Sequence, residues 1–543
     1  MCPGRTVSVA TGAEAFVELL NCHGVDYIFL NPGTDTFPIQ EAVTRFAVEE
    51  RRAPEIVVCP DESVGMAAAH GYFQVTGRAQ VVLVHVDAGT LQVGGALHNA
   101  QRGRIGVVLC AGHAPLTLEG ELRGSRSISI HWTQEQIDQG MIVRGLTKWD
   151  YELRRNESIH HVVNRAFQVA NAEPPGPVYL TLPREVLMEE VSSVRLPAPE
   201  DRQLPSTPQA DAEELDRAAR ILARSSRPLI IAGDPGRNPK AVDSLVELAE
   251  LLGAVVTTSA ERMSFPTTNP LWAGRSPGQY LQEADVILVV DADVPYVPLQ
   301  GKPTPDARII WIDRDPVKES IPLFTFPAHI RLHADSAKAL PALRQAVEGN
   351  LSRADRNRLE RRREQVATIN TERRAELLAS ARRLSSQEPI APAWLVHCID
   401  QVLGQDAVVL DETVTNAPVV VDYLTRTQPG TLLSQGGPAW DGLSAQRLGS
   451  NSPPRNAPSR PWWGTGPSFS GAPPLPSGWL SRPGRRSSPS SSITRCTMRP
   501  SGHGRWAIRK VMLSRPAGTW ERSWRLPRTT RSWPRPATPT ESE

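Results

Sequence analysis

The sequence has few cysteines and no long hydrophobic run. Its 543 residues include six Cys, at positions 2, 22, 59, 110, 398 and 496, and no two of them form a Cys-x-x-Cys pair. This spacing indicates neither a zinc site nor a disulfide framework. No apolar stretch approaches the ~18 residues of a membrane-spanning helix, and no N-terminal signal peptide is visible. We therefore expect a soluble protein of a reducing compartment, the cytoplasm, with no membrane partner.

The last part of the chain lacks acidic and β-branched residues. Residues 438–543 contain 17 Lys and Arg but only four Asp and Glu, and only three residues are Val or Ile. Pro, Ser and Arg predominate there, and such a segment cannot bury enough apolar surface to offset backbone entropy. We expect a disordered, low-complexity basic tail. A nucleic-acid-binding arm is the other interpretation, but aromatics between arginines are a weak indication, and we expect no nucleic-acid partner.

Short apolar runs alternate with helical patterns over the rest of the chain. The runs expected to be strands lie at residues 25–30, 55–60, 80–86, 105–112, 176–183, 228–233, 254–259, 285–293 and 307–315. Nearly continuous apolar runs of this kind favour parallel sheets that are covered on both faces. We expect an α/β fold of doubly wound parallel-sheet units at residues 1–190 and 205–345. A helical connector at 351–388 then leads to the start of a third, truncated unit at 389–437.

Two acidic residues stand where an expected strand runs into an expected helix. Glu62 follows the run EIVVCP, and Glu412 follows AVVL. Open parallel sheets bind ligands beyond the carboxyl ends of their strands. A helix dipole alone also favours an acid at this place, so position by itself leaves both interpretations open.

Four segments carry a more specific pattern. They are FLNPGTDTFP (29–38), PDESVGMAAAHGYFQVTG (60–77), VHVDAGTLQVGGALHNA (84–100) and GPVYLTLPREV (176–186). Together they resemble the pyrimidine-binding domain of the thiamine-diphosphate enzymes of the acetolactate synthase and 2-oxo-acid decarboxylase family. The first and third segments are most similar to the benzoylformate decarboxylase branch. HWTQEQ (131–136) resembles an FQE segment of the acetolactate synthase branch, with Thr133 where that family has Phe.

The resemblance implies roles for individual residues. Glu62 would bond the aminopyrimidine ring and favour its imino tautomer, which requires a carboxylate in a largely apolar place. His85 would donate or accept a proton near the reacting carbon; a buried strand-end histidine bonded to backbone is the alternative. Gln134 would reach the same site, and Thr34 would orient the substrate carboxylate. Further cofactor-binding residues implied by the resemblance are Pro32, Gly33, Glu412, Thr415, Asn416, Gly436 and Gly437.

Two further segments are compared with the family pattern. DAGTLQ (87–92) stands where the family has a GPGATN-like loop, so the loop contacts to substrate differ. IAGDPG (231–236) lies in the expected central Rossmann-like unit, which holds FAD in some relatives and is structural in others. A short Gly-rich turn is common in α/β proteins, so this segment does not decide between the two and FAD binding stays open.

The family's diphosphate motif is missing from the sequence. That motif is Gly-Asp-Gly followed at a fixed spacing by Asn, and its side chains hold Mg²⁺; no Gly-Asp-Gly occurs in this chain. Back-translated and read from the third base, residues 462–471 permit Val-Gly-Asp-Gly, and the same shift permits Asn-Asn at Ile493 and Thr494. We therefore expect a shift of reading frame near Gly437, and we assign no metal ligand in this chain. A basic tail that evolved separately is the alternative.

The resemblance implies a thiamine-diphosphate- and Mg²⁺-dependent decarboxylase or carboligase acting on a 2-oxo acid. It also implies a homodimer or homotetramer, in which the pyrimidine domain of one subunit faces the diphosphate domain of another. We expect activity and cofactor binding to be impaired in this chain, because the metal motif is lost. A non-catalytic α/β binding or scaffold protein is the alternative.

Overall fold

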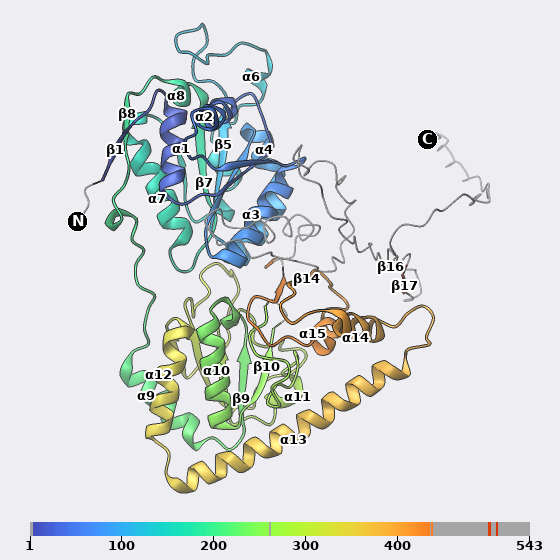
Figure 1. Cartoon of the computed structure of the whole chain (residues 1–543). Coiled ribbons are helices and arrows are strands. Elements are labelled where there is room, and N and C mark those ends of the chain that lie inside the picture. Colours follow the sequence, from blue (N-terminus) through green and yellow to red (C-terminus); the bar gives the residue numbers. More distant parts are fainter. Residues whose placement is uncertain (1–3, 260–261, 435, 438–497, 501–505, 509–543) are drawn as a thin grey trace, which may run out of the picture.

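A computed structural model of the chain describes residues 4–259, 262–434, 436–437, 498–500 and 506–508 (Figure 1). Its two larger sheets are parallel throughout and belong to an α/β fold, as predicted. They lie within the first two predicted units, whose exact limits stay predictions. In the tail, the structure describes only an antiparallel pair of short strands, β16 (Met498–Pro500) and β17 (Trp506–Ile508). The prediction of disorder and the shifted motifs otherwise lie outside the described residues.

The first unit is built on six parallel strands in the order β3-β2-β4-β5-β7-β6. They are β2 (Tyr27–Leu30), β3 (Glu55–Val58), β4 (Gln80–Val84), β5 (Val107–His113), β6 (Asp150–Glu152) and β7 (Val178–Pro183). An antiparallel pair, β1 (Thr6–Ser8) and β8 (Ser193–Arg195), joins the two ends of the unit. All five strands predicted here are present, whereas β6 was not predicted.

Helices cover both faces of this sheet. They are α1 (Gly12–Cys22), α2 (Phe37–Val48), α3 (Glu62–Thr76), α4 (Val86–Gln92), α5 (Gly94–Arg102), α6 (Ile130–Thr133), α7 (Ile159–Asn171) and α8 (Arg184–Met188). Side chains alternate between faces along a strand: Val81 of β4 packs into a cluster with α1 and α7, and Val82 packs into another with α3 and α5. Burial on both faces explains why these strands have nearly continuous apolar sequences.

The second unit repeats this arrangement with five parallel strands in the order β10-β9-β11-β12-β13. The strands are β9 (Pro228–Ala232), β10 (Val255–Thr258), β11 (Val286–Val290), β12 (Arg308–Asp313) and β13 (Ile330–His333). Its helices are α9 (Ala212–Arg224), α10 (Pro239–Leu252), α11 (Gly278–Leu281) and α12 (Ser336–Gly349). Apolar side chains from α9, α10 and α12 share one buried cluster with the sheet.

A long charged helix, α13 (Arg353–Arg383), follows as predicted and runs beneath the second unit (Figure 1). A capping box between Ser352 and Asp355 fixes its start. Arg358 and Arg362 then donate hydrogen bonds to the carbonyl oxygen of Ser225, which ties the helix to the second unit. None of the helices within the described ranges is long and apolar enough to cross a membrane.

The third unit contains the predicted helix, strand and helix. They are α14 (Pro392–Val402), β14 (Val409–Asp411) and α15 (Ala417–Tyr423), and β15 (Leu432–Ser434) then pairs parallel with β14. This part packs on its own apolar cluster, to which Met263 of the second unit contributes. The described residues of the third unit end at Gly437, just after β15.

The first unit lies above the second in Figure 1. Residues that precede strands of the first sheet contact residues that follow strands of the second sheet. Arg104, in the turn before β5, pairs at 2.6 Å with Asp293, just after β11. Glu173, before β7, likewise pairs with Arg314, just after β12. The amino edge of the first sheet therefore lies against the carboxyl edge of the second, which leaves the carboxyl edge of the first sheet free to carry a site.

Candidate active site

The carboxyl edge of the first sheet carries the first group of predicted residues. Parallel strands end at the same edge. Residues 32–34 follow β2, Glu62 follows β3 and His85 follows β4. The sequence predicted these positions separately, and the fold brings them to one edge.

Glu62 is the first residue of α3. Asp61 caps the helix by accepting a hydrogen bond from the backbone N–H of Ser63 at 2.9 Å. The Glu62 side chain is half-buried and lies against α4, where a Cβ on Gly89 would come within 3.2 Å of its Oε1 and 2.9 Å of Val84 Cβ. The carboxylate therefore faces the bare backbone of Gly89 beside the apolar side chain of Val84.

His85 is held by two side chains. Its Nδ1 bonds Oδ1 of Asp35, and it also forms a hydrogen bond with the side chain of Gln134. The hydrogen bond to Asp35 and the negative charge of that residue favour the imidazolium form more than burial disfavours it, so the pKa of His85 is raised. The structure thus joins His85 and Gln134, as predicted, and adds Asp35, which was not predicted although it directly follows Thr34.

The turn after β2 is shaped around His85. A Cβ on Gly33 would fall 2.1 Å from His85 Nδ1, so only glycine fits there. The Oγ1 of Thr36 closes the turn by accepting from the Gly33 N–H at 3.1 Å and donating to the Gly33 carbonyl at 2.9 Å. Pro32 and Thr34 are exposed on the same turn. Thr34 therefore stands where it can reach a substrate at the open edge.

The segment DAGTLQ forms helix α4 instead of an open loop. Val86 begins this helix with φ of +31°, an unusual value for a β-branched residue. The Gly89 N–H donates to the His85 carbonyl at 2.6 Å and so closes the first turn of α4. This turn begins at His85 and brings Gly89 next to Glu62. Asp87 accepts a hydrogen bond at 3.1 Å from Gln136, so the segment after α6 is tied to the same helix.

The second group of predicted residues lies at a different place. Gly436 and Gly437 pack against the end of α5, where a Cβ on Gly436 would lie 2.7 Å from Gly103 Cα and a Cβ on Gly437 would lie 2.5 Å from Asn99 Oδ1. Ser434 likewise accepts a hydrogen bond at 2.9 Å from Gln74, near the end of α3. Both helices end at the amino edge of the sheet. Within one chain the structure therefore does not bring this group to Glu62.

Glu412, Thr415 and Asn416 belong to the same second group. Glu412 directly follows β14, as predicted, but it does not begin a helix, and this part of the prediction is wrong. Asp411 accepts from both the N–H of Thr413 (2.9 Å) and its Oγ1 (2.6 Å) and so stabilises a turn, and α15 begins only at Ala417.

The glycines of IAGDPG have a packing role. A Cβ on Gly233 would lie 2.2 Å from the Asp291 carbonyl, and one on Gly236 would lie 2.1 Å from that of Met263. Close approach of the backbone therefore explains why both positions are glycine, without a bound phosphate. Across the described parts of the chain, no group of three His, Cys, Asp or Glu residues has an arrangement that could hold a metal ion.

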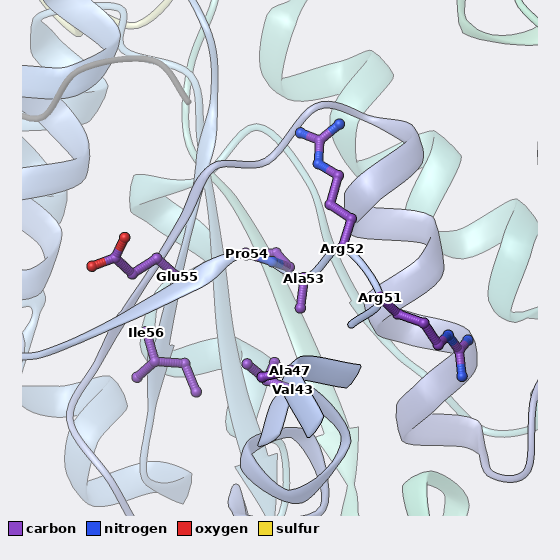
Figure 2. Close-up of a pocket in the computed structure, with 8 residues that line it drawn as sticks. All are labelled: Val43, Ala47, Arg51, Arg52, Ala53, Pro54, Glu55 and Ile56. Atoms are coloured by element: carbon purple, nitrogen blue, oxygen red, sulfur yellow. The ribbon is translucent and has the colours of Figure 1, made fainter. Parts of the chain in front are cut away.

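A cavity of about 480 Å³ lies away from this site, at the start of β3 and the end of α2 (Figure 2). Its cations are already paired: Arg51 with Glu18 at 2.8 Å, and Arg52 with Asp26 at 3.6 Å. Glu55 begins β3, whereas Glu62 follows the other end of that strand, so this cavity is not part of the candidate site. It is lined by Val43, Ala47, Arg51, Arg52, Ala53, Pro54, Glu55 and Ile56.

Comparisons with known proteins bear on these two units. The family profile described as thiamine pyrophosphate enzyme, N-terminal TPP binding domain, matches residues 10–142, and the profile for the central domain matches residues 215–343. An acetolactate synthase of Mycobacterium bovis is 27% identical over 319 residues, covering 57% of this chain and 49% of its own. A benzoylformate decarboxylase of Pseudomonas aeruginosa is 28% identical over 301 residues, 52% of each chain.

The fold is also found among solved structures. The crystal structure of benzoylformate decarboxylase from Polynucleobacter necessarius superposes with a TM-score of 0.64 at 20% identity, covering 82% of this chain and 78% of that one. The chain spans about half the length of the curated relatives that it matches. The two matched regions, residues 10–142 and 215–343, belong to the thiamine pyrophosphate enzyme family.

Proposed function

We propose that this chain has the architecture of a thiamine-diphosphate-dependent enzyme that removes CO₂ from a 2-oxo acid, and that the predicted loss of its metal motif impairs this activity. The product then either takes up a proton, as in a decarboxylase, or is joined to a second carbonyl compound, as in a carboligase. One observation carries the proposal: the Glu62 carboxylate lies against the bare backbone of Gly89, at the same sheet edge as His85. The names of the relatives, acetolactate synthase and benzoylformate decarboxylase, support the reaction class.

The residues at this edge fit the aminopyrimidine half of the cofactor. Thiamine diphosphate, when bound, supplies the electron sink for decarboxylation. Glu62 would share a proton with the aminopyrimidine ring, in the space that Gly89 leaves open. His85 and Gln134 would face the substrate, and Thr34 would orient its carboxylate. In the family, the Mg²⁺ ligands and most diphosphate contacts come from the segment that would follow Gly437, which is predicted to be out of frame in this chain.

We further propose that the active form is a homodimer or homotetramer in the cytoplasm. The residues near Gly436 lie at the amino edge of the first sheet, whereas Glu62 lies at the carboxyl edge, so a second copy is needed to bring such residues to Glu62. The described cysteines Cys22, Cys59, Cys110 and Cys398 are free, which supports a reducing compartment.

The test is CO₂ release from pyruvate and from benzoylformate with thiamine diphosphate and Mg²⁺. It is run on the chain as it stands and on a chain whose reading frame is restored after Gly437, each with Glu62→Gln as the matched variant. We expect release by the restored chain that falls at least about 100-fold in Glu62→Gln, which is the lower range for loss of an acid–base group. Absence of release from both chains, or release that is unchanged in Glu62→Gln, contradicts the proposal.

A further inference from the structure

The carboxylate of Asp35 is buried at the meeting point of three strand ends. Asp35 lies in the turn after β2, is 3% exposed, and its Oδ1 bonds Nδ1 of His85, just after β4. Its other oxygen, Oδ2, accepts a hydrogen bond at 3.2 Å from the Val86 N–H. The third strand is β5: a Cβ on Gly112 would fall 1.8 Å from that same oxygen.

Two glycines and one strained residue make room for this carboxylate. A Cβ on Gly33 would lie 2.4 Å from Oδ1 of Asp35, so glycines bound it on both sides. Val86, whose N–H it accepts, has the left-handed φ of +31° and is fully buried. Such a conformation of a β-branched residue persists only where its surroundings hold it, and Asp35 is the group that bonds its backbone.

We propose that Asp35 is a positioning residue that fixes the His85 imidazole with a proton on Nδ1 and directs Nε2 to the proton transfer with substrate. A carboxylate has only acceptor sites, so the nitrogen bonded to it has to carry the hydrogen. The remaining nitrogen is then the one that loses and regains a proton. Only one part of this inference rests on the proposed function, namely that the substrate receives the proton. The pairing of Asp35 with Nδ1 does not depend on it.

The proton transfer balances without a further reactant. Loss of CO₂ leaves the electron pair of the broken C–C bond with the substrate. That pair forms the new C–H bond with the Nε2–H proton of the imidazolium, and the N–H bonding pair remains on Nε2. The imidazole becomes neutral and keeps its Nδ1–H bond to Asp35, and water then returns a proton to Nε2. The raised pKa of His85 supports this role, because more of the donor form is present near neutral pH.

Other charged groups face His85 from the neighbouring elements. Asp87 of α4 favours the imidazolium. The buried His131 of α6 also faces His85, and its own pKa is lowered by burial and by nearby positive charges. Arg184 of α8 faces both His131 and Asp35. Among these groups, only Asp35 bonds Nδ1 directly, while Asp87 acts through space and accepts its hydrogen bond from Gln136. Asp87 therefore offers a matched control for the loss of one negative charge.

The test is ¹⁵N NMR of the full chain labelled at its 12 histidines, with His85→Gln identifying the signal. In the unmodified chain we expect neutral His85 to carry its proton on Nδ1. Asp35→Asn should lower the His85 pKa by about 1–3 units, the usual effect of a close opposite charge. Asp87→Asn should lower it less and leave the tautomer unchanged.

Three outcomes would overturn the inference. They are a neutral His85 with its proton on Nε2 in the unmodified chain, an Asp35→Asn variant with an unchanged pKa, and equal shifts in Asp35→Asn and Asp87→Asn. The tautomer of the unmodified chain decides the matter even where Asp35→Asn does not fold. These signals require neither cofactor nor turnover. Failure of the frame-restored chain to bind thiamine diphosphate would therefore count against the proposed function while leaving the Asp35–His85 pair measurable.

Discussion

Arg104 and Asp293 form a 2.6 Å ion pair that ties the first sheet to the second. Arg104 stands before β5 with a φ of +53°, and Asp293 follows β11. Lys318, which is 1% exposed, contacts the same Asp293 oxygen at 2.9 Å and also pairs with Asp313. Two cations thus converge on one carboxylate at the contact between the units.

Removal of Arg104 should therefore weaken the contact between the units. In Arg104→Ala, Asp293 keeps Lys318 but loses a short charged hydrogen bond, and we expect a loss of about 1.5–3 kcal/mol in the free energy of unfolding. Urea unfolding followed by tryptophan fluorescence measures this. The matched control is Arg144→Ala, whose exposed, solvent-screened ion pairs should contribute little to stability. Equal losses in the two variants would show that the contact between the units contributes little.

The same contact should make the free energy of unfolding depend on pH in the acidic range. Burial alone would raise the pKa of Asp293, but Arg104 and Lys318 outweigh it and lower this pKa to about 2. The value in an unfolded chain is about 3.9. The group therefore stabilises the fold fully above pH 4, and this contribution, about 2.5 kcal/mol, is lost as the pH falls from about 4 to about 2.

Asp293→Asn should remove that part of the acid dependence. The urea midpoint of the variant should be lower than that of the parent chain at pH 7, and the difference should shrink as the pH approaches 2. A difference between the two midpoints that stays constant from pH 7 to pH 2 would contradict the assigned cause.

The turn after β2 makes a separate prediction. Gly33→Ala places a Cβ on His85 Nδ1, so the turn or the imidazole has to move, at a cost of about 1–3 kcal/mol. Gly94→Ala, where no atom lies within 4 Å of the added Cβ, is the control and should be neutral or slightly stabilising. Thermal unfolding compares the two, and a Gly33→Ala variant as stable as the control would show that the turn yields easily.

Strands were predictable where burial on both faces gave a continuous apolar run. The run at Gln80–Val84 is buried throughout and was predicted from sequence. The strand Ile330–His333 alternates between buried and exposed positions, and Asp150–Glu152 has no apolar run, so neither was predicted. Both lie at a sheet edge, where neighbouring strands rather than local sequence define them.

Within the site, single residues were predictable where the family pattern names them, and contacts between loops were not. Glu62 lies at the helix start indicated by its sequence. Asp35 resembles an ordinary turn residue in the sequence, because its role appears only when the ends of β2, β4 and β5 meet. The ion pair of Arg104 with Asp293 joins residues 189 positions apart and has no local pattern at all.

The remaining prediction concerns the cofactor. We expect the chain as it stands to bind thiamine diphosphate with Mg²⁺ weakly or not at all. Glu62 and the space beside Gly89 suit the aminopyrimidine, but the sequence predicts that the diphosphate motif is out of frame at residues 462–471. A diphosphate without metal ligands or a helix N-terminus directed at it loses most of its charge-assisted hydrogen bonds.

Restoring the reading frame after Gly437 should recover binding, since the shifted sequence permits Val-Gly-Asp-Gly and the later Asn-Asn. Titration calorimetry with and without Mg²⁺ compares the two chains, and we expect at least a tenfold lower dissociation constant for the restored one, or about 1.4 kcal/mol. Glu62→Gln in the restored chain separates the two halves of the site, because it should weaken the aminopyrimidine contact and leave the dependence on Mg²⁺ intact. Tight, Mg²⁺-dependent binding by the unrestored chain would show instead that its own residues after Gly437 hold the diphosphate, and the frame-shift hypothesis would have to be given up.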